Sequence, residues 1–197
     1  MSFDVKTFFV IVAMCISVAA FYPYIRDVVR KKTQPHLYTW LIWTLTQGIA
    51  VAGIWYGGGG VGVLNLTVGW FFITVVLFLS FSRGTRNISP FDTMMLVAAL
   101  LAILVWWQLQ SALLAVLAAS AIDIIGYIPT IRKTYEEPWS ETVGVWIAFM
   151  VSNIVSIFAL DAYNVLTLTY IVSIILANGV LILVCLIRRR SRECSPA

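Results

Sequence analysis

The sequence is poor in charged residues. Only 11% of its 197 residues are Asp, Glu, Lys or Arg, and 61% are hydrophobic, whereas soluble globular proteins are roughly a quarter charged and half apolar. This shortage of charge argues against an ordinary soluble domain and favours an integral membrane protein. The net charge of +4 does not indicate a nucleic-acid partner, because the basic residues lie between long apolar runs.

The sequence also lacks the residue patterns of common catalytic and metal sites. His36 is the one histidine, which argues against a histidine-built metal site or a Ser-His-Asp triad. Cys15, Cys185 and Cys194 have no metal or redox spacing and predict no disulfide framework. No phosphate loop, nucleophile elbow or intramembrane carboxylate pair occurs. We therefore expect no enzyme activity, no cofactor and no metal.

Long apolar runs fill most of the chain. A spanning helix needs about 20 mostly apolar residues, and a break near Gln110 is required because the run around it is too long for one span. We expect the first run to be a retained helix rather than a signal peptide, since it continues directly into Pro23 and Arg26. The predicted fold class is all-α, with seven transmembrane helices at residues 8–29, 37–56, 61–81, 93–109, 111–131, 141–160 and 163–187.

The basic residues support seven spans and indicate an orientation. With alternate loops on opposite sides, twelve of the thirteen basic residues fall on one side and only Lys6 on the other. The positive-inside rule then predicts a multi-pass protein of the cell (inner) membrane, with its N-terminus outside and its C-terminus in the cytoplasm. The twelve are Arg26, Arg30, Lys31, Lys32, Arg83, Arg86, Arg132, Lys133, Arg188, Arg189, Arg190 and Arg192.

The chain resembles itself at a spacing of 106 residues. The segment Pro23-Tyr24-Ile25-Arg26 falls on Pro129-Thr130-Ile131-Arg132, Trp40 falls on Trp146, and Gln47 falls on Asn153. The third helix matches at a spacing of 102, through Val63–Thr67 and Val165–Thr169. The spacing predicts two parallel three-helix repeats joined by a single helix, which is a known transporter design. The predicted divisions are residues 1–86, a linker helix at 87–109, residues 110–187, and a basic cytoplasmic tail at 188–197.

These repeats resemble the PQ-loop superfamily, which includes the SWEET sugar transporters and lysosomal amino-acid exporters. In that superfamily a proline-glutamine pair stands near the end of the first helix of each repeat; here Pro23 and Pro129 occupy the proline positions, followed by Tyr24 and Thr130. The segments 22–26, 33–36 and 129–133 are most similar to uncharacterised bacterial PQ-loop-like proteins. The resemblance implies the 3+1+3 arrangement, a SWEET-like pocket asparagine at Asn178 and a pocket tryptophan at Trp55.

Several residues are candidates for a transport pathway. The amides of Gln47 and Asn153 fall near the middle of their helices, where a polar group needs a partner or a substrate. We predict that Gln47, Asn153 and Asn178 face a shared central cavity, with Asn65 and Trp55 as weaker candidates. Pro23 and Pro129 remove one helical hydrogen bond each, and are predicted hinges. The alternatives are interhelical hydrogen bonds for the amides and static kinks for the prolines.

Asp123 is the one acidic residue deep within an apolar run. Nine residues separate it from Arg132, which is roughly 13 Å along a helix and close to the midplane of a bilayer core. An ionised carboxylate there costs at least about 2.5 kcal/mol, so we expect Asp123 to be protonated, paired or facing water. A residue that loads and releases a proton, as in proton-coupled PQ-loop exporters, and a protonated residue in a structural hydrogen bond are the two interpretations. Its counterpart at the 106-residue spacing is Ser17.

The expected function is transport of a small polar solute, such as a sugar or an amino acid, by alternating access between the repeats, with a proton link through Asp123. The alternative is a non-transporting receptor or assembly factor on the same fold, because fold alone does not decide function. The expected partners are the solute and the lipid bilayer, without nucleic acid. Homo-oligomerisation stays open.

Overall fold

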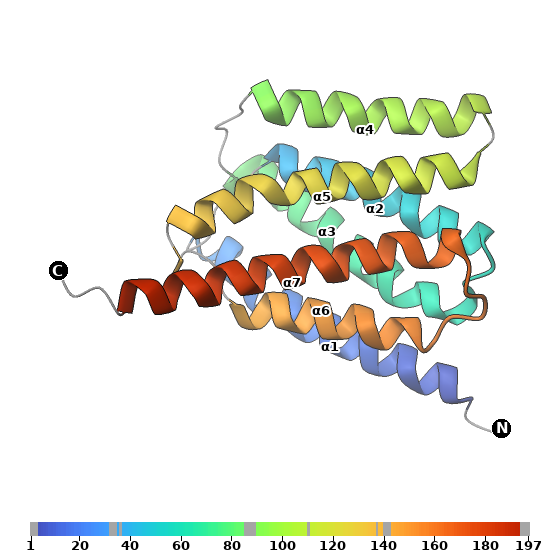
Figure 1. The fold of residues 1–197 in the computed structure, drawn as a ribbon, viewed down its shortest axis with the longest axis horizontal. Coiled ribbons are helices and arrows are strands. Elements are labelled where there is room, and N and C mark those ends of the chain that lie inside the picture. Colours follow the sequence, from blue (N-terminus) through green and yellow to red (C-terminus); the bar gives the residue numbers. More distant parts are fainter. Residues whose placement is uncertain are drawn as a thin grey trace.

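A computed structural model describes residues 4–31, 35, 37–84, 90–109, 111–136, 138–139 and 143–193. The described part of the chain is all-helical, without strands. It contains seven α-helices and one short 3-10 turn, and the α-helices lie roughly side by side along the length of the molecule (Figure 1). They are α1 (Val5–Val29), α2 (Leu37–Tyr56), α3 (Val63–Arg83), α4 (Pro90–Leu109), α5 (Ala112–Glu136), α6 (Val143–Ile157) and α7 (Val165–Glu193), with η1 (Gly60–Gly62) before α3.

Four of these helices are long and apolar enough to cross a membrane. They are α1, α2, the combined segment Gly60–Arg83, and α7, and the stretches Ala112–Ile128 and Val143–Ile157 are shorter apolar helices. Large apolar side chains on their outer faces are exposed, as at Phe71, Phe78 and Leu176. An apolar exterior of this kind is compatible with a lipid environment.

The helix boundaries lie close to those expected from the apolar runs. The chain breaks between Leu109 at the end of α4 and Ala112 at the start of α5, as the length argument requires. The second helix occupies the predicted range. The main difference is α7, which continues through the arginines to Glu193, so the first part of the predicted tail is helical.

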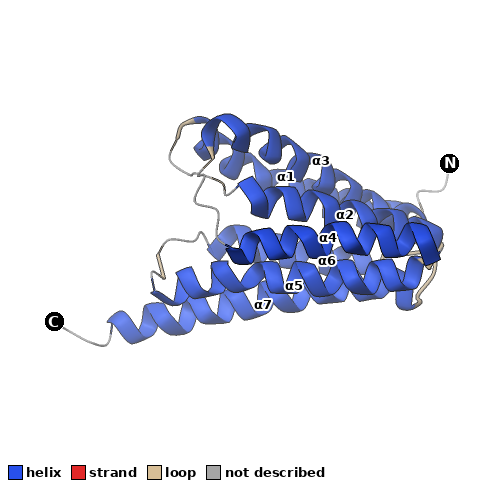
Figure 2. Ribbon diagram, turned by 90° about the horizontal axis from the view of Figure 1, so that it is seen from above, coloured by secondary structure: helices blue, strands red, loops and turns tan. Residues whose placement is uncertain are grey.

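Six helices form a closed ring, and the seventh lies outside it. Contacts join α1 to α3 and α6, α2 to α3 and α5, and α7 to α5 and α6. Helix α4 packs on α5 and α2 and lies at the upper edge of Figure 1. In the view from above, α1 and α3 diverge from α5 and α7 toward the C-terminal end of the molecule and approach them toward the other end (Figure 2).

The two ends of the bundle differ in charge. We call one the Lys6 end, because it holds Lys6, the glycine turn and Asp161. The other is the Arg83 end, which holds the basic residues in the last turns of α1, α3 and α7. At the Arg83 end, Arg83 Nη1 donates to the Val29 carbonyl over 2.9 Å, so a cation caps the C-terminus of α1.

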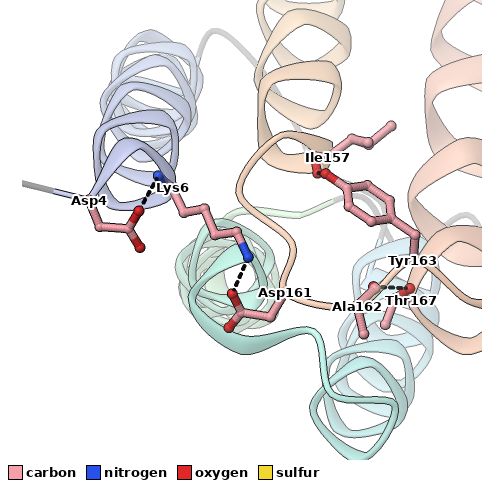
Figure 3. Close-up of polar contacts among 7 residues, drawn as sticks. All are labelled: Asp4, Lys6, Ile157, Asp161, Ala162, Tyr163 and Thr167. Atoms are coloured by element: carbon pink, nitrogen blue, oxygen red, sulfur yellow. Dashed lines mark hydrogen bonds and ion pairs between the residues drawn. The ribbon is translucent and has the colours of Figure 1, made fainter.

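The Lys6 end is tied together by loops that are far apart in sequence (Figure 3). Lys6 Nζ lies 2.7 Å from Asp161 Oδ1. The backbone N–H of Asp161 donates to the Gly59 carbonyl, and Asn164 Nδ2 donates to the Gly57 carbonyl. The α6–α7 loop therefore rests directly on the α2–α3 glycine turn.

Glycine is required in this turn at Gly60. Its φ is +56°, in the left-handed region that disfavours side chains. A Cβ there would also overlap the Asp161 carboxylate, whereas a Cβ at Gly144 in α6 would meet nothing within 4 Å. The turn thus combines a strained backbone conformation with close approach of the opposite loop.

We expect Gly60→Ala to lower the free energy of unfolding by at least about 1 kcal/mol, because it adds backbone strain and displaces Asp161 from Lys6. Gly144→Ala is the matched control and should leave stability unchanged or raise it slightly, since alanine favours helix. Thermal unfolding of both purified variants in detergent measures the difference. Equal stability of the two would contradict the role assigned to the turn.

Candidate functional site

A cluster of buried serines and one asparagine joins α1, α3 and α6. We call it the serine–asparagine cluster; it consists of Ser17, Asn65, Ser152 and Ser156, all at most 5% exposed. Ser17 Oγ donates to Asn65 Oδ1 over 2.8 Å, and Asn65 Nδ2 donates to Ser156 Oγ over 2.6 Å. The asparagine is thereby satisfied on both sides of its amide, as a polar group in an apolar core requires.

Ser17 and Ser152 connect α1 and α6, two of the three helices of this cluster, directly. Their hydroxyl oxygens lie 2.7 Å apart, and Ser152 Oγ is 2.8 Å from the Ala13 carbonyl. Small side chains let α1 and α6 approach closely at this point. Every group in the serine–asparagine cluster is neutral, so it needs no counter-ion.

A second buried cluster joins α2, α5 and α7, and it contains a carboxyl group. We call it the carboxylate cluster; it consists of Thr46, Asp123 and Tyr170. Thr46 Oγ1 donates to Asp123 Oδ1 over 2.8 Å, and the Tyr170 hydroxyl interacts with both of the other side chains. All three residues are at most 4% exposed. Asp123, which is predicted to lie deep within its helix, is thus buried among hydroxyl groups.

Aromatic side chains fill the space between the two clusters and the Arg83 end. The ring centroids of Phe21 and Phe149 lie 4.8 Å apart, and those of Trp43 and Tyr127 lie 5.7 Å apart. Trp146 contacts Tyr127, which lies one helical turn from Asp123. We call this set the aromatic layer; it comprises Phe21, Trp40, Trp43, Phe72, Tyr127, Trp146 and Phe149.

The contacts of the two clusters recur at the 106-residue spacing. Adding 106 to Ser17 gives Asp123, and adding it to Thr46 gives Ser152. The Ser17–Ser152 contact between α1 and α6 therefore corresponds, position by position, to the Asp123–Thr46 contact between α5 and α2. The 106-residue spacing, first seen as a match between sequence segments, thus also relates buried side-chain contacts in the structure.

The aromatic layer repeats in the same way. Phe21 and Phe149 correspond to Tyr127 and Trp43, and both pairs are in ring contact. The edge-to-face pair Trp40–Trp43 has an interplanar angle of 77°, and the corresponding pair Trp146–Phe149 has one of 76°. The first two pairs join helices that are distant in sequence, α1 with α6 and α2 with α5, so local similarity does not produce their match.

The third helices also correspond, at a spacing of 105 rather than the 102 suggested by the Val63–Thr67 match. Asn65 contacts Ser17 and Ser152, and Tyr170, 105 residues later, contacts Asp123 and Thr46. Arg83 donates to the Val29 carbonyl, and Arg188 donates to the Tyr135 carbonyl over 3.0 Å. The 102-residue spacing aligns residues at the starts of α3 and α7. The 105-residue spacing aligns residues whose side chains contact the neighbouring helices.

The predicted pocket amides are all buried, and each forms its hydrogen bond with a group outside this set. Gln47 Nε2 donates to the Leu66 carbonyl over 2.9 Å, and Asn153 Nδ2 donates to the Phe149 carbonyl of its own helix. Asn178 Oδ1 accepts from the Tyr127 hydroxyl over 3.3 Å. Asn178 therefore lies beside the aromatic layer, and Asn65 belongs to the serine–asparagine cluster. A cavity shared by these amides stays a prediction.

The remaining candidates lie away from the two clusters. Trp55 is 49% exposed at the Lys6 end of α2. Pro23 lies within α1, which continues past it to Val29. Pro129 lies within α5, and its side chain is outside the described part of the structure. The hinge role of the prolines stays a prediction.

Sequence reasoning did not single out most members of the two clusters. Ser152, Ser156 and Thr46 are small hydroxyl residues in apolar runs, and Tyr170 looks like an ordinary membrane aromatic. One signal was available, because the 106-residue spacing places Thr46 on Ser152 and Ser17 on Asp123, so that polar groups coincide in both halves.

Comparison of the chain with protein-family models, with curated proteins and with solved structures finds no match. The two buried clusters and the aromatic layer are accordingly the features from which a function can be inferred.

We predict that Asn65→Ala destabilises the protein by about 1–3 kcal/mol, because it removes the buried amide that accepts from Ser17 and donates to Ser156. Asn153→Ala is the matched control; it removes only a bond to the Phe149 carbonyl of its own helix and should cost less than about 1 kcal/mol. Chemical or thermal unfolding in detergent compares them. A larger loss for Asn153→Ala would contradict the importance given to the serine–asparagine cluster.

Proposed function

We propose that the chain is a small-solute transporter whose two halves, α1–α3 and α5–α7, rock against each other while α4 links them. The observation that carries this proposal is the recurrence of buried contacts at the 106-residue spacing, above all Ser17–Ser152 and Thr46–Asp123. Two halves related by an axis along the membrane normal can rock against each other around a site between them, which is the form that alternating access takes in parallel-repeat transporters.

The helix contacts support the 3+1+3 arrangement. Within each half the third helix packs between the first and second, as α3 does between α1 and α2 and α7 does between α5 and α6. The halves meet through α1 with α6 and through α5 with α2, which are corresponding pairs. Helix α4 lies outside the ring (Figure 1), and it reverses the chain so that the second half can run parallel to the first.

The carboxylate cluster supports a proton link. Thr46 Oγ1 lies 2.8 Å from Asp123 Oδ1 and 3.1 Å from the Ile42 carbonyl. A hydroxyl carries one proton, so Thr46 can donate either to an ionised Asp123 or, when Asp123 is protonated and donates to it, to Ile42. The same heavy-atom positions therefore serve both charge states, which suits a residue that gains and loses a proton during transport.

We place the protein in the cell membrane with the Lys6 end outside and the Arg83 end in the cytoplasm. The basis is the concentration of basic residues at the Arg83 end, which the positive-inside rule assigns to the cytoplasm. Reporter fusions after Arg86 and after Arg192 should both read cytoplasmic, and a reporter inserted between Gly57 and Gly60 should read external. The reverse pattern at either end would contradict this orientation.

The transport proposal predicts that the Lys6 end must open in each cycle. Lys6 of α1 and Asp161 of the α6–α7 loop come from different halves and form an ion pair there. In a background with Cys15→Ser and Cys194→Ser, we expect a reducible bifunctional thiol reagent to staple the Lys6→Cys, Asp161→Cys variant. Uptake of a metabolite mixture into proteoliposomes should fall to the level of empty liposomes and recover after reduction.

The two single-cysteine variants treated with the same reagent are the controls, and both should retain uptake. Flux that persists through the stapled double variant would contradict alternating access at this end. Absence of any uptake by the unmodified protein across the mixture would favour a receptor or assembly factor on this fold.

A further inference from the structure

We propose that the transported solute is an organic monovalent cation, and that it exchanges with a proton at Asp123 between the carboxylate cluster and the aromatic layer. This inference rests on the proposed transport function and names its substrate class. It is drawn from the charge of one buried residue and from the rings and the unpartnered indole N–H beside it.

The first argument is charge balance. Asp123 lies in the middle of α5, whereas the other acidic residues of the described helices lie in a first or last turn. Of the helices packed against α5, α2 has no charged residue, α7 has none before Arg188, and α4 has only Asp92, near its start. The groups that face Asp123 in the described structure are neutral hydroxyls, those of Thr46, Tyr170 and Tyr127. The described residues around Asp123 therefore supply no cation to balance the carboxylate, and a proton or a bound cation must do so.

The second argument is the aromatic surface next to this carboxyl group. Tyr127 stands one turn from Asp123 on α5, Trp43 stands one turn from Thr46 on α2, and the two rings are in contact. Tryptophan and tyrosine faces bind organic cations through their negative π-surfaces, and more strongly when water is excluded. A carboxylate with adjacent aromatic faces is the combination that recognises an ammonium group, whereas a neutral solute would leave the buried charge unbalanced.

The third argument is an unused hydrogen-bond donor. Trp43 Nε1 is buried and has no hydrogen-bond partner within the described structure. Gly126 of α5 faces it, and a Cβ at this glycine would stand 3.2 Å from the indole nitrogen. Buried donors are rarely left unpaired. A solute that carries an acceptor, such as a hydroxyl near its ammonium group, would satisfy this donor, and Gly126 places no side chain of α5 against the indole nitrogen.

The exchange balances in atoms and charge. When the cation arrives, the O–H bond of the protonated Asp123 breaks, the proton leaves to water, and the carboxylate forms an ion pair with the ammonium group. When a proton returns, it rebinds the carboxylate and the cation leaves. One residue thus binds either species but not both, so movement of the cation one way is linked to movement of a proton the other way.

Choline and its uncharged isostere 3,3-dimethylbutanol are the probes for the purified full chain in detergent. Isothermal titration calorimetry at mildly acidic pH, in two buffers of different protonation enthalpy, gives both the affinity and the number of protons released. We expect choline to bind with release of up to one proton, and the isostere to bind at least about tenfold more weakly, a difference of about 1.4 kcal/mol.

Asp123→Asn should abolish both choline binding and proton release, while Asp27→Asn, the same change at the exposed end of α1, should alter neither. Trp43→Leu keeps the acid and should weaken choline at least about tenfold; it provides a second test if Asp123→Asn does not fold. Equal binding of choline and its isostere, or proton release that survives Asp123→Asn, would overturn the inference.

The two proposals fail separately in these measurements. Uptake of neutral solutes into proteoliposomes without choline binding would leave the transport function standing and remove the cation class. Choline binding with proton release but no uptake of any solute would leave the cation site standing and remove the transport function.

Discussion

The low polarity of the interior of this helix bundle is the constraint on which the rest of the structure depends. Each buried polar group must find its partner within the protein, because an unpaired one costs several kcal/mol in hydrocarbon. The serine–asparagine cluster meets this requirement with neutral groups that satisfy one another across three helices. The carboxylate cluster meets it only partly, because two hydroxyls can hydrogen-bond Asp123 but cannot balance its charge.

The difference between the clusters has a mechanical consequence. Ser17–Ser152 and Thr46–Asp123 occupy corresponding places at the two contacts between the halves. The first contact has the same charge under all conditions and can act as a constant joint. In the proposed exchange, the second changes its charge with the occupant of Asp123 and can therefore change its strength. The proposed mechanism thus has one fixed and one adjustable interface between the halves, through the residues at two positions.

Much of the fold could be predicted from the sequence, because lipid-facing helices need long apolar runs and the lengths of those runs are limited by the bilayer. The break near Gln110 could be predicted from the length of the apolar run alone. The depth of Asp123 could be predicted because it is an acidic residue inside an apolar run. The partners of Asp123 could not be found in this way. Thr46 and Tyr170 come from other helices, and which faces of α2 and α7 turn toward α5 is decided by packing rather than by local sequence.

The amides show a second limit of sequence reasoning. Depth along a helix was predicted for Gln47 and Asn153, but depth does not determine direction. Gln47 turns to the Leu66 carbonyl of α3, and Asn153 turns back to its own helix. Residues that contact the other half are recognised only by contacts that recur at the 106-residue spacing. Residues such as Asn153 form their hydrogen bonds locally instead.

The two ends of the bundle are held together by different kinds of contact. At the Lys6 end the halves are joined by an ion pair and by loop hydrogen bonds that water can replace. Toward the Arg83 end the helices diverge (Figure 2), and between that end and Asp123 the halves are joined by ring contacts, which can slide without breaking fixed hydrogen bonds. Asp123 lies between a polar closure that can be opened by solvation and an aromatic closure that can be opened by rearrangement of rings. In the proposed transport cycle, a buried charge in this position is neutralised from one side at a time, which is the condition that coupled exchange requires.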